Sequence, residues 1–502
     1  MASALTPSAI LQQRWGDTWL IGTGAESFWS QLEQFQNQFQ GQLPNDILLA
    51  EPDPIRFLAA FFAAVQHPGC VWLANPHWGN QEWAQVAAQC QPDHVIGKVP
   101  TIITTSGRIQ NSANRHRTLI ASPSPPLPLS PTSSILIPTG GSSGNIRFAT
   151  HTWNTLTASV QGFQQHFACD RVHAYCVLPL HHISGLMQAM RCLLSGGQLA
   201  IQAFPDLLIH GALTVPSQDE LPSREQNQFL SLVPTQLQRL LKVEWEAINW
   251  LRQFQAILLG GAPAWPNLLQ TARELGLPLA PTYGMTETAA QVATLLPSEF
   301  WAGQGGNGRA LPHAELTIQG VDGHKLPPGQ VGQIAIATPS LALSVGRQAI
   351  ASPLLTGDLG YLNQAGYLQV VGRATSLIIT GGEKVLPTEV EAAILAMELV
   401  ADVAVLGIPD ADWGEQVVAV VAGIPETEAS MSTDIHQRLQ SALKKQLSPY
   451  KIPKQWFCRS KLPRNAHGKL NRPMLHQWVM AQLSPIAAAT AATLALEDGA
   501  DE

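Results

Sequence analysis

This chain of 502 residues contains few charged side chains. Asp, Glu, Lys and Arg make up 13% of it, against about 25% in typical soluble domains, whereas 45% of its residues are hydrophobic. The net charge of −7 gives no electrostatic reason to expect a nucleic acid or an anionic membrane as a partner. We therefore expect a globular protein with an unusually neutral surface.

Long hydrophobic runs and cysteine motifs are also missing. Stretches such as Phe57–Val65 fall far short of the roughly 18 residues that suggest a membrane span. The first residues lack a basic stretch followed by an apolar one, so no secretory signal is expected. The six cysteines form no CxxC pair, which is typical of reduced residues in a cytoplasmic protein.

The remaining pattern predicts an α/β fold. The chain is too long for one compact core, so two or more domains are expected. Helical and extended segments alternate, which favours βαβ units with parallel strands. Helices are predicted at 55–65, 152–167, 183–194 and 236–241, and extended segments at 70–74, 172–180, 198–204, 229–233 and 254–259.

A second series begins after a change of composition near Val370. It is predicted to contain helices at 389–397 and 435–447 and strands at 400–406 and 416–424. We therefore expect a large N-terminal domain of mixed sheets flanked by helices (1–374), and a smaller, mobile α+β C-terminal domain (375–480). The Pro/Ser-rich segment 122–134 is predicted to be a linker or surface loop, and the tail at 481–502 to be disordered.

One segment is suited to holding a polyphosphate. After an apolar stretch, the chain brings together three glycines, three hydroxyls and one cation: Gly140, Gly141, Gly144, Thr139, Ser142, Ser143 and Arg147. Glycines let the backbone approach an anion, while hydroxyls, amides and arginine donate to phosphate oxygens. The spacing differs from that of the P-loop, and an ordinary turn is the alternative for this segment taken alone.

Three later segments are predicted to be turns at strand ends. Gly260–Pro263 follows an apolar strand, at the edge where α/β sheets bind ligands. Tyr283 offers a ring to stack on a base, and Glu287 a carboxylate suited to Mg²⁺. Asp358, in Thr356–Asp358, can accept hydrogen bonds from a ribose diol. Each segment alone could be a plain turn, but together they predict an ATP site.

These residues bring the sequence close to a known family. Over about residues 130–475 it resembles the AMP-forming acyl-CoA synthetases, which include luciferases and the adenylation domains of peptide synthetases. The resemblance rests on eight motifs in family order: Thr139–Arg147, Leu178–Gly185, Gly260–Pro263, Tyr283–Glu287, Thr356–Asp358, Gly372–Arg373, Gly381–Lys384 and Pro463–Leu470.

The resemblance implies a reaction in two steps that uses ATP, Mg²⁺ and CoA. A carboxylate attacks the α-phosphorus of ATP, giving an acyl-adenylate and pyrophosphate. The small domain then rotates, and the CoA thiol displaces AMP. Lys469 is expected to neutralise charge between the carboxylate and the α-phosphate, Arg373 to contact the ribose, and Gly381 and Gly382 to line a tunnel for the pantetheine arm.

The resemblance also assigns roles residue by residue. Catalysis is expected of Arg147, Thr286, Glu287 and Lys469, and Mg²⁺ binding of Glu287. Nucleotide or CoA binding is expected of Thr139, Gly140, Gly141, Ser142, Ser143, Gly144, Gly261, Ala262, Pro263, Tyr283, Gly284, Asp358, Arg373, Gly381 and Gly382.

The chain departs from the family pattern at three places. Its phosphate loop continues as Gly144-Asn-Ile-Arg-Phe where the family has Gly-x-Pro-Lys-Gly, which changes the geometry of the cation. Thr375 stands where the hinge commonly has Asp or Lys. His467 stands where a small hydroxyl residue usually precedes Gly-Lys.

Within the family, the chain is most similar to the o-succinylbenzoate–CoA ligase branch of menaquinone and phylloquinone biosynthesis. The segment before the phosphate loop is short, and Ile146–Phe148 followed by Thr150–Trp153 is typical of that branch. His182 and Ser184 are expected to contact the second carboxylate of such an acid; the alternative is that His182 only packs at the pocket and gates it.

Three other functions stay open from the sequence alone. The chain could be a ligase for another small aromatic or aliphatic acid, which would keep every catalytic residue. It could load a carrier protein, although no carrier domain is attached. It could also be a non-enzymatic AMP-binding regulatory protein, which would have no reason to keep Lys469.

Overall fold

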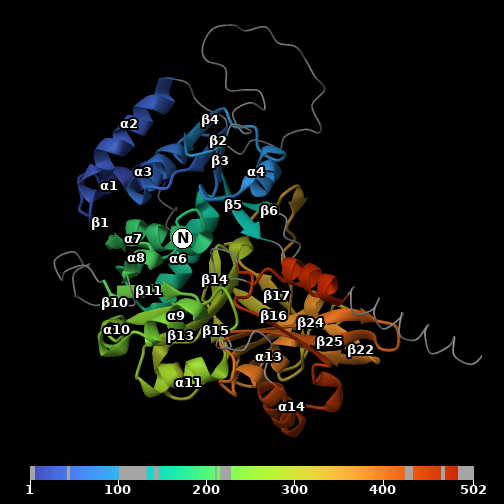
Figure 1. Cartoon of the computed structure of the whole chain (residues 1–502). Coiled ribbons are helices and arrows are strands. Elements are labelled where there is room, and N and C mark those ends of the chain that lie inside the picture. The colour runs from blue at the N-terminus through green and yellow to red at the C-terminus, as the bar shows by residue number, and fades with distance from the viewer. Residues whose placement is uncertain are drawn as a thin grey trace, which may run out of the picture.

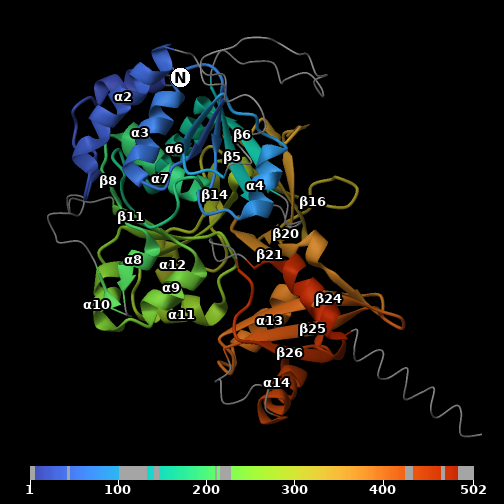
Figure 2. The ribbon, with the colours of Figure 1, turned by 45° about the horizontal axis from the view of Figure 1, so that its top comes forward.

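The computed structural model describes residues 6–41, 46–100, 133–140, 146–209, 212–214, 228–423, 433–464 and 470–483. Two large sheets dominate the N-terminal part (Figures 1 and 2). The first is parallel from β1 to β13 and antiparallel beyond. Its strands are, in spatial order, β1 (Leu20–Ile21), β8 (Leu199–Ile201), β7 (His173–Cys176), β11 (Gln228–Leu232), β12 (Ala256–Leu259), β13 (Leu279–Met285), β14 (Ala290–Thr294) and β15 (Arg309–Ala310).

The second large sheet also mixes the two directions. It is parallel from β4 through β2 and β3 to β5 and antiparallel from β5 onward. Its strands are, in spatial order, β19 (Gln348–Ala349), β18 (Ser344–Val345), β6 (Ile146–Thr152), β5 (Ser134–Gly140), β3 (Cys70–Leu73), β2 (Asp46–Ala50) and β4 (His94–Gly97).

Helices cover both large sheets. One hydrophobic core joins residues of both sheets with α2 (Phe28–Gly41), α3 (Pro54–Ala64), α6 (Trp153–Phe167) and α7 (Ile183–Ser195). A second core packs the first sheet against α8 (Phe204–Leu207), α9 (Pro234–Leu241), α10 (Glu244–Leu251), α11 (Pro266–Glu274) and α12 (Pro297–Trp301). The N-terminal part is therefore layered, with helices between the sheets and outside them.

Two smaller sheets follow. An antiparallel sheet contains β16 (Glu315–Gln319), β17 (Gly332–Ala337), β20 (Leu354–Leu362) and β21 (Leu368–Arg373). The last sheet contains β22 (Ile378–Thr380), β23 (Glu383–Val385), β24 (Asp402–Asp410), β25 (Gly414–Ala422) and β26 (Gln455–Arg459). It packs against α13 (Pro387–Leu395) and α14 (Thr433–Gln446) in a core of its own. Figure 2 shows these orange and red elements gathered at one side of the molecule.

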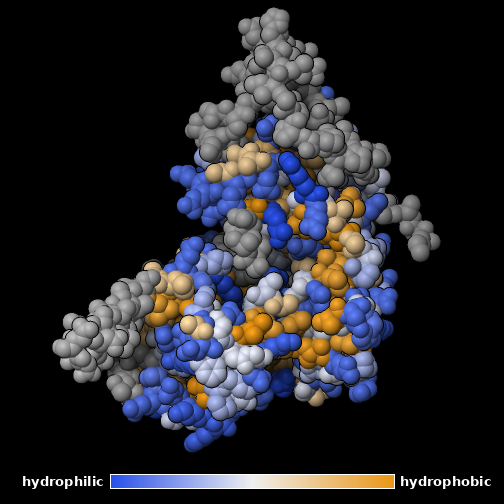
Figure 3. All heavy atoms as spheres, turned by 90° about the vertical axis from the view of Figure 1, so that its right-hand side faces the viewer, coloured by the Kyte–Doolittle hydropathy of each residue, from blue (hydrophilic) through white to orange (hydrophobic). Residues whose placement is uncertain are grey.

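The remaining elements are short. They are α1 (Pro7–Gln13), η1 (Ala25–Ser27), α4 (Asn80–Ala87), β9 (Leu208–Ile209), β10 (Ala212–Leu213), η3 (Thr286–Thr288), η4 (Ala374–Ser376) and η5 (Pro449–Lys451). Residues 472–483 form a further helix. Figure 3 shows hydrophobic residues gathered across the middle of one face, with hydrophilic residues around them.

The α/β prediction is confirmed, with several corrections. Residues 198–204 were predicted to be extended throughout, but the strand ends at Ile201 and Phe204 starts helix α8. The antiparallel sheet of β16, β17, β20 and β21 had no counterpart in the prediction. Residues 481–483 were predicted to belong to a disordered tail but are helical, and 484–502 lie outside the described residues. The linker predicted at 122–134 is described only from Ser133, and Ser134 begins β5.

The division of the chain at Thr375 stays a prediction. That residue lies in the short turn η4, after the last strand of the antiparallel sheet and before the first strand of the five-stranded sheet.

Local sequence explains where two central helices begin. Asp53 accepts a hydrogen bond from the backbone N–H of Arg56 (2.7 Å), and Pro54 follows it at the first helical position of α3. Thr152 and Thr155 cap α6 reciprocally, each side chain accepting from the other's backbone N–H. Such caps satisfy donors that have no partner inside the helix.

Asn307 and Gly308 join the first large sheet to the antiparallel sheet. The Asn307 N–H donates to the carbonyl of Leu368 (2.8 Å), and the Leu368 N–H donates to that of Gly308 (2.8 Å). The Asn307 amide also donates to the carbonyl of Thr282 (3.2 Å) in β13. This segment therefore sets how two sheets that carry predicted site residues lie relative to one another.

Gly308 should be irreplaceable at this joint. Its φ is +78°, and an added Cβ would lie 1.9 Å from the Thr294 carbonyl carbon. We expect Gly308→Ala to lower the free energy of unfolding by about 3 kcal/mol, because backbone would have to move. Gly303→Ala is the matched control: its φ is +86° but nothing lies within 4 Å, so only the conformational cost of about 1 kcal/mol remains. Equal urea midpoints for the two variants would contradict this account.

Candidate active site

The predicted phosphate loop connects two antiparallel strands. β5 and β6 pair so that Thr139 lies opposite Arg147, and Gly140 opposite Ile146. Directly opposed side chains point to the same face of an antiparallel pair, so Thr139 and the exposed Arg147 share one face. Gly141, Ser142, Ser143 and Gly144 lie outside the described residues.

That face of the hairpin meets the predicted magnesium ligand. The Thr139 hydroxyl lies 3.4 Å from Glu287 Oε1 and donates to it, across 148 residues of sequence. Glu287 sits in η3, the short turn that follows β13. The structure therefore brings together a residue of the phosphate motif and the carboxylate expected to bind Mg²⁺.

The backbone of this turn is held from several sides. Ser340 Oγ donates to the carbonyl of Thr288 (2.9 Å), Ser159 Oγ to that of Ala289 (2.6 Å), and the Ala342 N–H to that of Glu287 (2.8 Å). Ala289 (φ +50°) and Ala290 (φ +80°) adopt left-handed conformations, which are costly for alanine. These contacts fix the conformation from which Glu287 projects.

His151 is a further anchor of the same turn. Its Nε2 lies 2.7 Å from the carbonyl oxygen of Thr286, and its Nδ1 lies 3.0 Å from Thr155 Oγ1. Because a carbonyl only accepts, the ring donates through Nε2–H. The side chain is fully buried, and burial lowers its pKa to about 4, so the ring is neutral at physiological pH.

A second group of predicted residues converges on Asp358. The Tyr283 hydroxyl donates to Asp358 Oδ2 (2.8 Å), and Arg373 Nε donates to Oδ1 (2.9 Å). Burial, and then the nearby Asp358 carboxylate, raise the pKa of Tyr283, so the phenol stays protonated and keeps donating. Each carboxylate oxygen can accept a second hydrogen bond, which leaves capacity for a diol.

The segments Tyr283–Glu287 and Thr356–Asp358 were predicted to be turns, but both lie wholly or partly within strands. Tyr283 belongs to strand β13, and only residues 286–288 turn. Thr356–Asp358 lies within β20, at an irregularity in its pairing with β17. There Gly357 has φ +76°, and the Asp358 N–H donates to Thr356 Oγ1 (3.1 Å). A bulge changes the direction of a side chain without ending the strand. Because glycine is common in both bulges and turns, Gly357 in the sequence could not show which of the two is present.

Gly260–Pro263 lies at the predicted sheet edge. It follows β12, whose last residue, Leu259, pairs with Pro281 in the parallel neighbour β13. A Cβ on Gly260 would lie 2.9 Å from Thr282 Cγ2. The segment containing Gly261, Ala262 and Pro263 therefore leaves the sheet beside the strand that carries Tyr283 and Gly284.

His182 and Ser184 lie at the start of α7. His182 occupies the N-cap position of this helix without a capping hydrogen bond from its side chain, and its ring centroid is 4.8 Å from that of His181. Ser184 is exposed. Gly185 lets the helix start close to the preceding backbone, because an added Cβ would lie 2.2 Å from the Pro179 carbonyl oxygen. The roles of His182 and Ser184 in binding an acid stay predictions.

Gly381 and Gly382 form the hairpin turn between β22 and β23. Their φ angles are +57° and +81°, the left-handed region that favours glycine. The Gly381 N–H donates to the carbonyl of Trp413 (2.8 Å), and an added Cβ would lie 2.7 Å from the Trp413 ring. Lys469 lies outside the described residues, so its role also stays a prediction.

Sequence reasoning missed the residues that hold the site in place. His151, Ser159 and Ser340 bond backbone carbonyls more than 50 residues away along the chain. Histidine and serine in such positions carry no local signal of their partner. Burial of His151 within β6 could be suspected, but its contact with Thr286 depends on tertiary structure.

Family models match two parts of the chain. The AMP-binding enzyme model matches residues 37–344, and the AMP-binding enzyme C-terminal domain model matches residues 389–469. The chain belongs to the AMP-binding enzyme family. Its architecture is that family's fold, with a large N-terminal and a smaller C-terminal domain.

Two curated relatives carry the same name. A 2-succinylbenzoate–CoA ligase of Geobacillus sp. (strain WCH70) is 34% identical over 315 residues, 60% of each chain. A protein of the same name from Listeria monocytogenes is 33% identical over 359 residues, 70% of each chain. The matched part thus spans 60% of the length of the Geobacillus relative.

Solved structures show the same fold over almost the whole chain. o-Succinylbenzoate CoA synthetase from Bacillus subtilis, in complex with the acyl-adenylate intermediate OSB-AMP, has a TM-score of 0.73 and 24% identity, and covers 93% of this chain and 97% of that chain. The same enzyme with ATP and a magnesium ion has a TM-score of 0.70, 25% identity and coverage of 92% and 98%. Within the described residues, no helix combines the length and hydrophobicity needed to cross a membrane.

The buried neutral histidine makes the protein sensitive to acid. The unfolded chain binds a proton at His151 near pKa 6.5, and the folded chain only near pKa 4. The free energy of unfolding therefore falls as the pH drops. We expect His151→Gln to remove about 2 kcal/mol of this loss between pH 7 and pH 5. Parallel pH profiles of urea unfolding for wild type and variant would show that His151 does not contribute.

Proposed function

We propose that this protein is an AMP-forming acid–CoA ligase that converts o-succinylbenzoate into o-succinylbenzoyl-CoA. This is a step of menaquinone and phylloquinone biosynthesis. Family membership and the names of its relatives support the reaction class and the acid. The observation that carries the proposal is a pair of neighbouring contacts. Tyr283 and Arg373 both donate hydrogen bonds to Asp358. Glu287, four residues after Tyr283 in the sequence, accepts a hydrogen bond from Thr139.

These two neighbouring contacts suit the ribose and the phosphates of one nucleotide. Tyr283 and Glu287 lie on the continuous segment β13–η3. We assign the Asp358 carboxylate, oriented by Tyr283 and Arg373, to the ribose hydroxyls, and Thr139 and Arg147 to the phosphates. An anion bound beside the Glu287 carboxylate needs a compensating cation. Mg²⁺ held by Glu287 would supply that charge.

The donor set around Glu287 fits magnesium. The described residues contain no group of three or more His, Cys, Asp or Glu side chains that could hold a metal ion. Mg²⁺ is usually bound by one or two carboxylates together with substrate phosphates and water. A single carboxylate from a rigid turn, next to a phosphate motif, matches that mode.

The chemistry proceeds in two half-reactions. The carboxylate oxygen of the acid attacks the α-phosphorus of ATP, and the bond from that phosphorus to the bridging oxygen of pyrophosphate breaks. Lys469 donates to the carboxylate oxygen and to the α-phosphate, and its positive charge offsets the repulsion between these two anions as they approach. The thiolate of CoA then attacks the acyl carbon, and AMP leaves. The turn of Gly381 and Gly382, which has no side chains, is where we place the pantetheine arm.

The acid is proposed to be recognised at the start of α7. The half-buried ring of His182 and the exposed hydroxyl of Ser184 can both donate to a carboxylate. o-Succinylbenzoate carries a second, aromatic carboxylate that benzoate lacks. We also propose a cytoplasmic location, which is supported by the fact that all six cysteines are free thiols.

Lys469 should be needed for adenylation but not for nucleotide binding. We expect Lys469→Ala to slow pyrophosphate exchange into ATP by about 10²–10³-fold, while the Kd of ATP changes little. Lys461→Ala is the control, because it removes the same charge from an exposed residue eight positions earlier. Exchange at the wild-type rate in the Lys469 variant would refute the assigned role.

Substrate preference tests the identity of the acid. Pyrophosphate release should be measured with ATP, Mg²⁺ and CoA and, in turn, o-succinylbenzoate, benzoate, coumarate and octanoate. We expect o-succinylbenzoate to be preferred by at least about 100-fold in kcat/KM, because a missing carboxylate leaves its partners unpaired. His182→Ala should reduce this preference. Comparable rates with all four acids would overturn the proposal.

A further inference from the structure

Helix α4 lies against the strand that carries Arg147. Figures 1 and 2 show α4 beside β6, and the two share a hydrophobic core in which Trp83 and Val86 of the helix pack with Phe148. The Phe148 ring also meets the ring of Trp72 in β3, with the two centroids 4.9 Å apart. Buried side chains therefore fix the position of α4 relative to β6.

Two glutamines of this region bond the backbone of one residue in β6. The Ile146 N–H donates to Gln85 Oε1 (2.7 Å), and Gln89 Nε2 donates to the carbonyl of Ile146 (2.9 Å). Gln89 Nε2 also donates to the carbonyl of Gln85 (3.0 Å). Because a backbone N–H only donates and a carbonyl only accepts, the two side-chain amides must present opposite groups to Ile146.

The two glutamines take the place of a neighbouring strand. β18 is the neighbour of β6 on this side, and just past its end the Gly346 N–H donates to the carbonyl of Phe148 (2.8 Å). The N–H and C=O groups of alternate residues in a strand point to the same side, so those of Ile146 face the same way as those of Phe148. Side chains from α4 therefore continue the hydrogen-bond ladder where β18 has ended.

This clamp acts at the end of the pairing between β5 and β6. Ile146 is the first residue of β6 and lies opposite Gly140, and Arg147 follows it opposite Thr139. The ends of an element open more easily than its middle, because fewer contacts hold them. Hydrogen bonds to both backbone groups of Ile146 hold this end in place, and with it the backbone from which Arg147 projects.

We infer that Gln85 and Gln89 are positioning residues for Arg147, an inference that rests on the proposed function. An arginine on a frayed strand end would lose backbone as well as side-chain freedom on binding a phosphate, and that loss opposes binding. Here Arg147 meets the phosphates that leave as pyrophosphate with its backbone already held. Both glutamine side chains are uncharged, so neither cancels the positive charge of the guanidinium.

Exchanging each glutamine for glutamate should have opposite results. Gln85→Glu keeps an acceptor for the Ile146 N–H, whereas Gln89→Glu removes the donor to the Ile146 carbonyl. We expect Gln89→Glu to raise the KM of ATP in pyrophosphate exchange by about 10-fold, and Gln85→Glu to leave it within about twofold of wild type. Because both variants add one negative charge beside the same residue, charge alone cannot produce this difference. Equal KM values in the two variants would overturn the inference.

Further measurements separate positioning from a merely structural role. Thioester formation from supplied acyl-adenylate and CoA proceeds without pyrophosphate, so Gln89→Glu should leave its rate unchanged. Gln89→Met removes the donor without adding a charge, and it carries the test if the glutamate variant does not fold. Gln81→Glu is the matched control, because Gln81 is an exposed residue one turn before Gln85 on α4; both half-reactions should stay at the wild-type rate. If Gln89→Glu lowers both half-reactions together, or lowers only the urea midpoint, the inference is wrong.

Arg147→Ala separates failure of the inference from failure of the proposed function. If Gln89 acts through Arg147, adding Gln89→Glu to the Arg147→Ala variant should raise the KM of ATP no further. A further rise as large as that seen in wild type would overturn the positioning role alone. If Arg147→Ala itself leaves the KM of ATP unchanged, the proposed phosphate role of Arg147 fails first, and the positioning role fails with it.

Discussion

The Asp358 carboxylate connects the first large sheet to the antiparallel sheet, and residues of both sheets share one hydrophobic core. Tyr283 reaches it from the first large sheet and Arg373 from the neighbouring strand of the antiparallel sheet. The backbone contacts of Asn307 and Gly308 hold the two sheets in the relation that permits this. If that joint moved by an ångström or two, the hydrogen bonds would be lost, and the Asp358 carboxylate would no longer lie beside the segment that carries Glu287.

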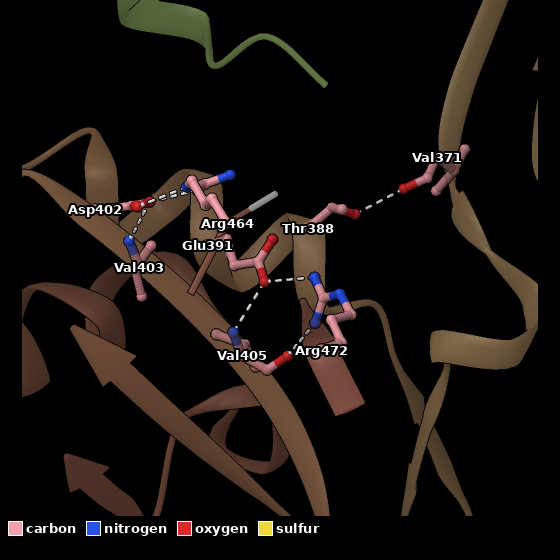
Figure 4. Close-up of polar contacts among 8 residues, drawn as sticks. All are labelled: Val371, Thr388, Glu391, Asp402, Val403, Val405, Arg464 and Arg472. Atoms are coloured by element: carbon pink, nitrogen blue, oxygen red, sulfur yellow. Dashed lines mark hydrogen bonds and ion pairs between the residues drawn. The ribbon is translucent and has the colours of Figure 1, made fainter. Parts of the chain in front are cut away.

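A second feature of the molecule is that uncharged groups hold the turn from which Glu287 projects. The Glu287 turn is fixed by a neutral histidine, two serines and a backbone amide. Neutral anchors add no charge that would compete for a cation or repel a phosphate. In the C-terminal part, by contrast, charged side chains pair with one another, as Arg464 does with Asp402 and Arg472 with Glu391 (Figure 4). Charged anchors on the N-terminal turn would disturb an adjacent phosphate site.

The sequence predicted part of the regular frame, and it missed helices such as α2, α4 and α11 as well as the antiparallel sheet. Helices with capping signals, such as α3 and α6, were found nearly to the residue. The antiparallel sheet was missed because its strands are polar on one side and interrupted by glycine, as at Gly357 and Gly360. Tyr283 and Asp358 were predicted as site residues, but the hydrogen bond between them spans 75 positions. Nothing local to either residue indicates such a partner.

By itself the sequence determined the chemistry available to this protein. The glycine and hydroxyl segment, the carboxylates and the order of the motifs are properties of the chain, and they led to the family. Tertiary structure alone decided which of these groups meet, because strand register and sheet packing bring Thr139 to Glu287, and Asp358 to Tyr283 and Arg373. It also decided the contacts of His151, Ser159 and Ser340 with backbone carbonyls that lie 52 to 135 residues away along the chain. Those distances exceed the reach of any local pattern.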